Sequence, residues 1–320
     1  MDTKPLGLWE WPTIISITNS KKTIIFCFRM TSKRVLTYLK LDNSNSVLAQ
    51  FGQCLVSALL KKDEHDDINE VSVNCDLADG QGLVLSHPGP VLLRHPPFCP
   101  MYHWKKQVLH KNPGVSVAVA VILESSDTKV LITRRPPHMR TFPNVWVPPG
   151  GGSEEAETIQ ETGLREVLEE TGLDLKPILT FSQPLCLWES VYPPLLAKGE
   201  PKRHTLVIYL HVLVSKDSKD LIKSIKLDPQ ETNACAFLNL EQIQLATNYD
   251  TKLDTNETLT VHELNGDHLK SLRQSYDLLR AEVPNSGSFD IERISTGTRF
   301  ALEQFFNKKK RLQNFSNNKL

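Results

Sequence analysis

Residues 151–173 read GGSEEAETIQETGLREVLEETGL, and this stretch decides how the rest of the chain is interpreted. It satisfies the pattern G-x5-E-x7-R-E-U-x-E-E-x-G-U, in which U is an aliphatic residue. The matched positions are Gly151, Glu157, Arg165, Glu166, Val167, Glu169, Glu170, Gly172 and Leu173. Carboxylates, a guanidinium and glycines at set distances indicate a built site rather than an ordinary run of surface charge.

The stretch predicts a loop followed by a helix over about Glu157–Thr171. At about 100° per residue, one face of that helix carries Glu166, Glu169 and Glu170. The opposite arc carries the packing residues Leu164, Val167 and Leu168. Magnesium prefers hard oxygen ligands and is usually held by a few carboxylates together with substrate phosphates. The acidic face is therefore the candidate metal site.

Glycines flank this helix on both sides. Gly150, Gly151 and Gly152 precede it, at a point where the backbone must come close to a metal and a diphosphate. Gly172 follows it in the usual position for a helix cap. The flanking residues thus predict a tight loop, the helix and a defined end.

Arg165 is expected to turn toward the loop and pair with Glu157. A bidentate arginine–carboxylate pair fixes planar geometry better than lysine could, so Arg165 is interpreted as a positioning residue. The acids outside the pattern are expected to form an ordinary solvated face. They are Glu154, Glu155 and Glu161.

Composition limits the class of protein. The chain has 320 residues, of which 40% are hydrophobic and 23% charged, and 37 basic residues balance 37 acidic ones. We therefore expect neither stable DNA binding nor membrane insertion, and the apolar runs are of strand length. No cleavable signal is evident.

The six cysteines show no paired spacing and are expected to be reduced and buried. His95, His103 and His110 are expected to be surface or packing residues rather than zinc ligands.

Strand patterns surround the predicted helix. Apolar segments before it predict a hairpin of two strands, Val115–Glu124 and Lys129–Arg134, and a short strand at Trp146 and Val147. Later strands are expected at Ile178–Trp188, Thr205–Val214 and Ala234–Leu240, with a short helix from Glu241. This series favours an α/β fold with a mixed sheet and helices on both faces. Over about Gly114–Asp250 it resembles the Nudix family, whose fold is an α/β/α sandwich.

The flanks are expected to be separate additions. We expect an N-terminal accessory region over 1–112, the Nudix domain over 113–260 and a C-terminal helical extension over 261–320. The first includes the amphipathic segment Val47–Leu60, and Met30 is an alternative start. The last has expected helices at His268–Arg280 and Thr298–Phe306, and it ends in a basic tail that begins at Lys308.

Short segments outside the helix narrow the resemblance to a vertebrate branch of the Nudix family that acts on nucleoside diphosphates linked to another group. These segments are RHPPFCP from Arg94, LITRR from Leu131, NVWVPPGG from Asn144, LWESVYPP from Leu187 and STGTRFAL from Ser295. The resemblance implies Mg²⁺- or Mn²⁺-dependent hydrolysis of a phosphoanhydride. It suggests m7G-capped mRNA as the substrate and m7GDP as the product.

Hydrolysis also needs a base to take a proton from water. Glu166, Glu169 and Glu170 are the expected metal ligands, and Glu169 is the first choice of base. Loop acids are alternatives, namely Glu231 and Glu189. Sequence does not decide among them.

The segment LWESVYPP carries a second hypothesis. A methylated guanine is cationic, so Trp188 or Tyr192 could stack on it while Glu189 accepts from its Watson–Crick edge. The plainer interpretation is a strand end in which Trp188 packs in the core and Glu189 faces water, and strand alternation favours it by about two to one.

Basic residues near the helix are candidates for contacts to outer phosphates. Lys202, Arg203 and His204 precede one strand, and Arg134, Arg135 and Arg140 precede the glycine run. Solvated loop charge is the commoner role. A capped RNA would need such a basic track, because phosphate neutralisation dominates nucleic-acid affinity.

Two alternative functions stay open at this point. One is a diphosphatase for coenzyme A thioesters or nucleotide sugars, since LITRRPPHMRTFPNVWVPPGG loosely resembles a segment of such enzymes. The other is a catalytically silent nucleotide-binding module, although every acid of the pattern is present. The expected location is the cytoplasm, with the nucleus as an alternative because of the basic tail. Oligomeric state is not predicted.

Overall fold

The computed structural model describes residues 34–41, 45–60, 69–78, 82–104, 114–248, 258–280 and 291–317. All of them belong to one compact unit that begins at Lys33. Met30 and His110 lie outside the described residues, so the alternative start and the expectation for that histidine are not addressed by the structure.

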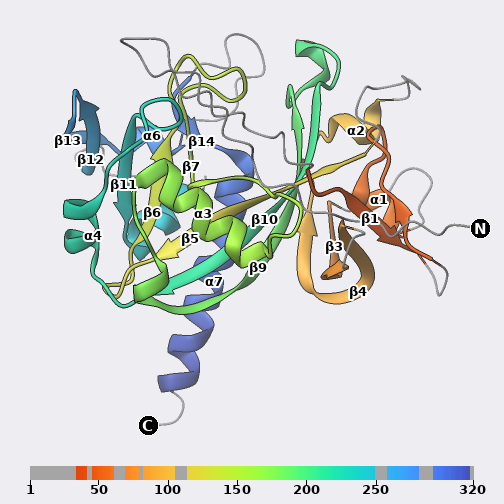
Figure 1. Cartoon of the computed structure of the whole chain (residues 1–320), viewed down its shortest axis with the longest axis horizontal. Coiled ribbons are helices and arrows are strands. Elements are labelled where there is room, and N and C mark those ends of the chain that lie inside the picture. Colours follow the sequence, from red (N-terminus) through yellow and green to blue (C-terminus); the bar gives the residue numbers. More distant parts are fainter. Residues whose placement is uncertain are drawn as a thin grey trace, which may run out of the picture. The chain divides into compact units, whose positions relative to one another are not determined.

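The centre of the molecule is a mixed β-sheet with the strand order β13-β12-β11-β6-β5-β10-β9-β4-β1-β2 (Figure 1). The strands that frame the site are β5 (Ser116–Glu124), β6 (Val130–Arg134), β9 (Leu179–Tyr192), β10 (Arg203–Val214) and β11 (Ala234–Leu238). Strand β10 runs parallel to β5 and antiparallel to β9, and β11 runs antiparallel to β6. The predicted mixed sheet is therefore confirmed.

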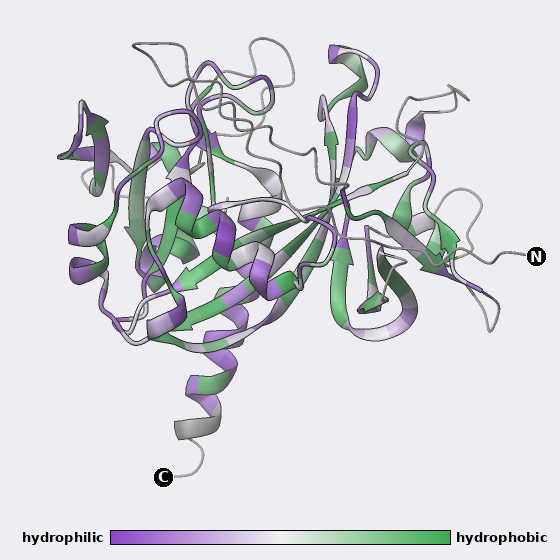
Figure 2. Ribbon diagram, viewed as in Figure 1, coloured by the Kyte–Doolittle hydropathy of each residue, from purple (hydrophilic) through white to green (hydrophobic). Residues whose placement is uncertain are grey.

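Helices cover both faces of this sheet. Helix α3 (Ile159–Thr171) packs on one face, and α5 (Leu240–Thr247), α6 (Asp277–Arg280) and α7 (Thr296–Asn317) belong to the core of the other. Successive side chains of β10 point to opposite faces of the sheet and so enter both hydrophobic cores. Leu206, Ile208 and Leu210 pack on the α3 side, and Tyr209 packs on the α7 side. The result is the expected α/β/α sandwich. Figure 2 shows the hydrophobic colouring of the central strands against the mixed colouring of the helices.

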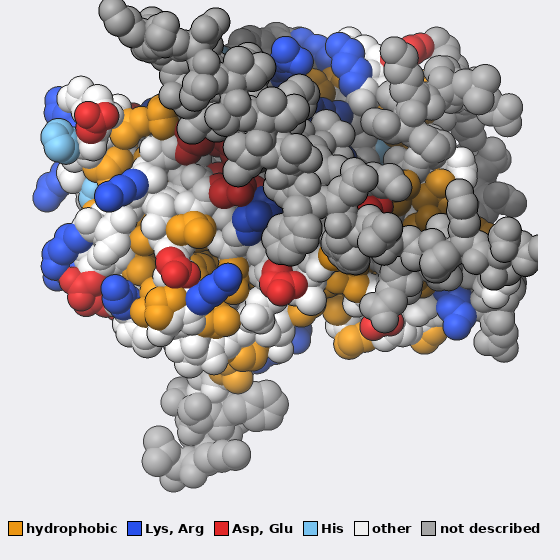
Figure 3. Space-filling view, viewed as in Figure 1, with side chains coloured by type: hydrophobic (Ala, Val, Ile, Leu, Met, Phe, Trp, Pro, Cys, Tyr) orange, Lys and Arg blue, Asp and Glu red, His pale blue; other side chains and the backbone are white. Residues whose placement is uncertain are grey.

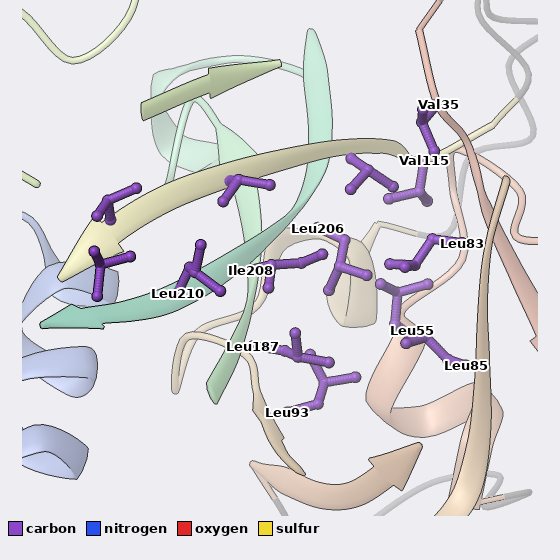
Figure 4. Close-up of a cluster of buried hydrophobic side chains, with 14 of the residues drawn as sticks. Val35, Leu55, Leu83, Leu85, Leu93, Val115, Leu187, Leu206, Ile208 and Leu210 are labelled. Atoms are coloured by element: carbon purple, nitrogen blue, oxygen red, sulfur yellow. The ribbon is translucent and has the colours of Figure 1, made fainter. Parts of the chain in front are cut away.

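The N-terminal region continues the central sheet instead of forming a separate one. Its elements are β1 (Thr37–Lys40), β2 (Val47–Leu48), α1 (Leu55–Leu60), β3 (Glu70–Ala78), β4 (Gly82–Arg94) and α2 (Pro100–His103). Strand β4 pairs in parallel with β9, where Leu93 faces Leu187 and Arg94 faces Trp188. Figure 4 shows Leu55, Leu83, Leu93 and Leu187 in one apolar cluster with the β10 side chains. The accessory region thus shares both sheet and core with the central domain.

The expected helix at His268–Arg280 is wrong for most of its length. Residues His268–Ser275 form strand β13, which pairs antiparallel with β12 (Thr258–Asn265), and only Asp277–Arg280 is helical. Gly266 adopts a φ of 61° in the turn between the two strands, a conformation that favours glycine. Pairing with β12, whose Leu259 and Val261 are buried, therefore overrides the local helical propensity.

The C-terminal helix is longer than predicted. It runs from Thr296 to Asn317 and buries Phe300 and Phe305, so the basic run that begins at Lys308 lies within it and is not a loose tail. Lys308 and Lys309 contact His211 and Glu124 on the sheet. No helix among the described residues is both long and apolar enough to span a membrane.

The remaining elements near the site are short. They are β7 (Val145–Val147), β8 (Gly150–Gly152), α4 (Ser218–Ser224) and β14 (Arg293–Ile294). Strand β8 pairs with β5, and β14 pairs with β7 in parallel. These pairings bring the glycine run and the C-terminal segment to the same end of the sheet as α3.

Candidate active site

Helix α3 begins with a side-chain cap that satisfies its free backbone donors. Thr158 Oγ1 accepts from the Glu161 backbone N–H at 3.1 Å, and the Glu161 carboxylate accepts from the Thr158 N–H at 2.8 Å. This reciprocal arrangement fixes the first turn, so Glu161 has a structural role that its off-pattern position did not predict. Gly172 ends the helix in the left-handed region with φ of 70°, as expected.

The buried side of α3 differs in part from the prediction. Leu164 and Val167 are buried as expected, but the side chain of Leu168 is 46% exposed. Gly163 explains the difference, since a Cβ at this position would lie 2.9 Å from Val121 Cγ2 on the sheet. The helix therefore approaches the sheet most closely along the Gly163–Val167 side, which turns Leu168 toward solvent.

The glycine run supplies a close backbone wall beside the acids. A Cβ at Gly150 would lie 2.2 Å from the Val119 carbonyl oxygen, and a Cβ at Gly151 would lie 2.4 Å from Glu166 Oε2. Only glycine fits either position without displacement. The Gly150 N–H donates to Glu170 Oε1 at 3.2 Å, so β8 also orients one of the carboxylates.

Arg165 joins the loop to the helix by four partners. Its guanidinium makes a bidentate pair with Glu157, Nε to Oε1 at 2.6 Å and Nη2 to Oε2 at 3.0 Å. The predicted contact to Glu157 is therefore present. Arg165 also donates to the Gly152 carbonyl, to Glu166 at 2.7 Å and to Glu169 at 3.1 Å. A single fork thus holds the loop and two acids in place.

Three carboxylates converge at this end of the sheet. Oxygens of Glu166, Glu170 and Glu231 all lie within 4.8 Å of one another. Burial raises the pKa of Glu170 to about 8, and the neighbouring charges of Glu166 and Glu231 add to the effect against the Gly150 hydrogen bond. Burial also raises the pKa of Glu166, although Arg165 opposes it. Acids that resist ionisation when crowded fit a site whose charge a cation would neutralise.

Glu231 enters this group from a loop that docks on the end of α3. The Asp228 N–H donates to the Glu170 carbonyl at 3.0 Å, and Thr232 Oγ1 donates to Glu170 Oε2 at 3.4 Å. These contacts hold the loop so that the exposed Glu231 meets the two buried acids. Figure 3 shows acidic and basic side chains close together near the centre of the face that it presents.

Glu169 lies outside that group of three. Its side chain is 46% exposed and accepts from Arg165. Of the three expected metal ligands, the structure thus brings Glu166 and Glu170 together and adds Glu231 in place of Glu169.

A pocket of about 660 Å³ opens beside the acids. Its wall includes the Gly150–Gly152 backbone, so the pocket reaches the same strand that contacts Glu166 and Glu170. Its aromatic lining is formed by Phe98, Phe142, Trp188, Tyr192 and Tyr209. Its charged lining consists of Arg34, Arg135, Arg203 and Arg293, with no carboxylate side chain among the described lining residues. Flat apolar surfaces and cationic groups together fit a nucleotide.

The structure separates Trp188 from Glu189. Trp188 lines the pocket and is only 6% exposed, with its ring 5.8 Å from that of Phe300. Glu189 points to the opposite face of β9, is fully buried, and is contacted by the Leu55 N–H and His204. It neither faces water nor is among the described residues that line the pocket, so the structure does not place Glu189 where a substrate ligand or a base is expected. Trp188 is packed in the core and also forms pocket wall.

The basic side chains predicted to contact outer phosphates fall into two groups, those that line the pocket and those that do not. Arg203 and Arg135 line the pocket, and burial lowers the pKa of Arg135. Lys202 is exposed and is not among the lining residues, so its predicted contact to substrate is not supported. His204 is buried against the Phe51 carbonyl, and Arg134 is held by Asn233, Glu263 and Glu292. Arg140 is exposed and is absent from the described lining.

Sequence analysis missed the contribution of the C-terminal segment. Arg293, Ser295 and Gly297 line the pocket, and Arg293 is only 2% exposed while its Nε has no hydrogen-bond partner among the described residues. A Cβ at Gly297 would lie 2.8 Å from Trp188 Cδ1. The run STGTRFAL was noted only as a resemblance, and the parallel pairing of β14 with β7 is what brings it to the pocket.

Comparisons with known proteins agree with this geometry. The NUDIX domain profile matches residues 114–258. A zebrafish (Danio rerio) protein named m7GpppN-mRNA hydrolase NUDT17 is 35% identical over 288 residues, which cover 85% of this chain and 94% of that protein. The human (Homo sapiens) protein of the same name is 36% identical over 252 residues, 72% of this chain and 76% of that protein.

A solved structure is also similar in part. The crystal structure of a MutT/nudix family protein from Enterococcus faecalis shares 17% identity and a TM-score of 0.35, with 65% of this chain and 66% of that chain covered. The assignment of this chain to a family therefore depends on the sequence relatives and not on this structural similarity.

Proposed function

Since the chain belongs to the Nudix hydrolase family, we propose that it hydrolyses a phosphoanhydride of m7G-capped RNA, with Mg²⁺ or Mn²⁺, and releases m7GDP. The observation that carries this proposal is the convergence of Glu166, Glu170 and Glu231 beside a pocket lined by arginines and aromatic rings. The names of the relatives that cover most of this chain support the choice of capped RNA.

The residues present fit a divalent cation. Glu166 and Glu170, the two buried members of the group, would hold it, because hard carboxylate oxygens are the ligands that Mg²⁺ and Mn²⁺ prefer. When bound, the cation would neutralise phosphate charge and lower the pKa of a coordinated water. The space left by the missing side chain of Gly151 allows Glu166 to take this position.

A protein carboxylate must take the proton of the attacking water. Glu231 is the favoured base, because it is exposed and its oxygen lies within 4.8 Å of both Glu166 and Glu170. Glu169 is the second candidate, and its carboxylate is already engaged by Arg165. Arg165 itself acts as a positioning residue, since it holds Glu166 and the Glu157 loop in one arrangement.

The pocket offers separate surfaces for the base and for the phosphates. Phe142 and Tyr192 lie with ring centroids 5.0 Å apart at 69°, and both are partly exposed, so a cationic methylguanine can contact their faces. Arg135 and Arg203 are the candidate phosphate contacts. The buried Arg293 guanidinium carries unused donor capacity at Nε and can bind a phosphate or a carbonyl oxygen of the base.

Product analysis tests the proposal. Capped RNA, unmethylated capped RNA, coenzyme A esters and nucleoside-diphosphate sugars are incubated with the protein, Mg²⁺ or Mn²⁺ and ¹⁸O-labelled water. We expect m7GDP from capped RNA, with labelled oxygen on the attacked phosphorus. Preferential cleavage of a coenzyme A ester or a sugar would reject capped RNA while leaving the family chemistry intact.

Two variants assign the base in the same assay. Glu231→Gln is expected to lose activity by about 100-fold or more, and Glu169→Gln by less, because base catalysis contributes about 100- to 10,000-fold. The reverse order would assign the base to Glu169.

We also propose a cytoplasmic location, in keeping with an mRNA substrate. Imaging of the tagged full chain in cells tests this location, and exclusive nuclear staining would contradict it.

A further inference from the structure

A second cluster of metal-ligating side chains lies away from the acids of α3. Cys54, His95, Cys99 and Glu189 each place one ligand atom so that all four lie within 4.8 Å of one another. They come from four parts of the chain: the residue before α1, the loop after β4, the start of α2 and the middle of β9. Their exposures are 6%, 5%, 1% and 0%. Cys54 and Cys99 are free and buried and His95 is buried, as a packing role requires, and the structure in addition brings the three together with Glu189.

Two distances from Cys54 match those of a tetrahedral site. Cys54 Sγ lies 3.5 Å from His95 Nδ1 and 3.5 Å from Glu189 Oε2. Around a zinc ion with Zn–S of about 2.3 Å and Zn–N or Zn–O of about 2.0–2.2 Å, a sulfur lies about 3.5 Å from a nitrogen or oxygen ligand. These two separations therefore equal those between ligands of one ion, and the remaining ligand atoms lie within 4.8 Å of one another.

Neighbouring groups orient Glu189 toward the cluster. Its Oε1 accepts from the Leu55 N–H at 2.9 Å and lies 3.0 Å from His204 Nε2, which leaves Oε2 facing Cys54. His204 Nδ1 lies 2.6 Å from the Phe51 carbonyl oxygen, which can only accept, so Nδ1 carries a proton. Such outer contacts are typical of carboxylate and histidine ligands in metal sites.

Ligand chemistry gives a second reason for an ion at this place. Neutral buried thiols pack like small apolar groups, so the burial of two cysteines alone carries no argument. Their convergence with an imidazole and a carboxylate, with four ligand atoms within 4.8 Å of one another, is the feature that points to an ion. Thiolate and imidazole ligands in a tetrahedral set favour zinc over Mg²⁺, Ca²⁺ and Mn²⁺.

We propose that Cys54, His95, Cys99 and Glu189 bind one structural Zn²⁺ that is separate from the catalytic cation. The ion would join the N-terminal region to the central sheet, because Cys54, His95 and Cys99 come from the former and Glu189 from β9. It would also position one rim of the pocket. Pro96, Pro97 and Phe98 stand between two of the ligands and line the pocket, and Trp188 and Ser190 flank the fourth and do the same.

Metal analysis of the purified full chain tests the site without reference to activity. Protein made in zinc-containing medium, with Mg²⁺ in the buffers, is gel-filtered and analysed by inductively coupled plasma mass spectrometry. We expect about one zinc per chain in the wild type and at least a tenfold lower content in Cys99→Ser. The matched control is Cys75→Ser, which removes a thiol outside the cluster and should leave the zinc content unchanged.

A second variant separates this site from the α3 acids. The double variant Glu166→Gln with Glu170→Gln should keep its zinc, because neither residue belongs to the proposed zinc ligands. Loss of zinc in that variant, with zinc retained in Cys99→Ser, would assign the metal to the α3 acids and overturn the proposal.

A spectroscopic measurement covers the case in which Cys99→Ser does not fold. Wild-type protein is produced with Co²⁺ in place of zinc, and the absorption of tetrahedral cobalt with thiolate charge-transfer bands is expected. Folded wild-type protein that binds neither ion, or that shows a Cys54–Cys99 disulfide in the unreduced mass spectrum, would contradict the proposal. These outcomes do not depend on which phosphoanhydride the protein cleaves.

Discussion

Among the described residues, two clusters of ligating side chains differ in ligand type and in exposure. Glu166, Glu170 and Glu231 offer only oxygens and include one exposed member beside a pocket wall. The four-residue group of Cys54, His95, Cys99 and Glu189 offers two sulfurs and a nitrogen besides one carboxylate oxygen, and it is buried throughout. The first suits a hard cation that shares its coordination with substrate and water, and the second suits a closed, soft site.

A third buried polar cluster supplies the control for this comparison. His211 Nε2 donates to Glu124 at 2.8 Å, Lys308 donates to His211 Nδ1 at 3.2 Å, and Lys309 pairs with Glu124. Its carboxylate already has a cationic partner, and both ring nitrogens of a neutral His211 are satisfied. Burial alone therefore does not indicate a metal; the convergence of four side chains that can each offer a ligand atom does.

The largest expected effect is at the oxygen cluster. Glu166→Gln keeps the size of the side chain but removes a negative ligand, so we expect kcat/KM for hydrolysis to fall by about 1,000-fold or more. Zinc content should stay at the wild-type value. Steady-state kinetics and metal analysis of the same preparation measure both, and Glu155→Gln, an exposed acid outside the pattern, is the control. Wild-type activity in Glu166→Gln would remove the oxygen cluster from the mechanism.

The next effect concerns the backbone that shapes this cluster. In Gly151→Ala the new Cβ would lie 2.4 Å from Glu166 Oε2, and we expect a loss of activity of about 100-fold from displacement of that carboxylate. Gly152→Ala is the matched control, because a Cβ there has nothing within 4 Å. Steady-state kinetics and melting temperatures of the two variants separate a loss of activity from a loss of stability. Equal activities would show that the close approach of backbone at Gly151 is unimportant for hydrolysis.

A smaller effect is expected at the arginine fork. Arg165→Lys keeps the charge but cannot bond Glu157 at two points while also reaching Glu166, so we expect activity to fall by about tenfold to 100-fold. The affinity for Mg²⁺ should weaken in the same direction, and calorimetric titration of the two proteins measures it. An unchanged affinity and rate would mean that charge alone, not geometry, is what Arg165 supplies.

The smallest effect is the pH dependence of the cluster formed by His211, Glu124, Lys308 and Lys309. Burial lowers the pKa of His211, and contacts with His211 and Lys309 lower the pKa of Glu124 despite its burial. Both groups bind protons more weakly in the folded chain than in the unfolded one. The contribution of His211 to stability is present above the ordinary histidine pKa of about 6.5 and is lost as pH falls through its folded pKa, whereas that of Glu124 is present above the ordinary glutamate pKa of about 4.3 and is lost only at lower pH.

Thermal unfolding of the wild type and of His211→Gln between about pH 7.5 and pH 5 tests this sign. We expect the melting temperature of the wild type to fall more steeply with acidification, by a few degrees over the range. Zinc content should be the same in both proteins at neutral pH. A steeper fall in His211→Gln would reverse the assignment.

The sequence predicted the local parts of the site well. The pattern in residues 151–173 predicted α3, its glycine cap and the pairing of Arg165 with Glu157, because all three depend on spacing within a few turns of chain. The strands next to α3 in the sequence, β5, β6, β7, β9, β10 and β11, followed from alternation and length, but their order in the sheet did not. Where long-range pairing competed with local propensity, as at His268–Ser275, the prediction was wrong.

Which face of a strand borders the pocket was harder to predict. Alternation in β9 requires Trp188 and Glu189 to face opposite ways, but it does not say which face borders the pocket. Packing against Phe300 and His204 decides this, and it removes Glu189 from the substrate site.

By itself, the sequence determined the family, the sandwich fold, the acidic end of α3 and the glycines that let backbone approach it, since each is encoded in contiguous residues. Only the tertiary structure brought Glu231 to Glu170, Arg293 to the pocket, and Cys54 to Cys99 and Glu189. The reason is that helical and strand periods specify which side chains share a face of one element, whereas contacts between elements depend on how every face is packed at once.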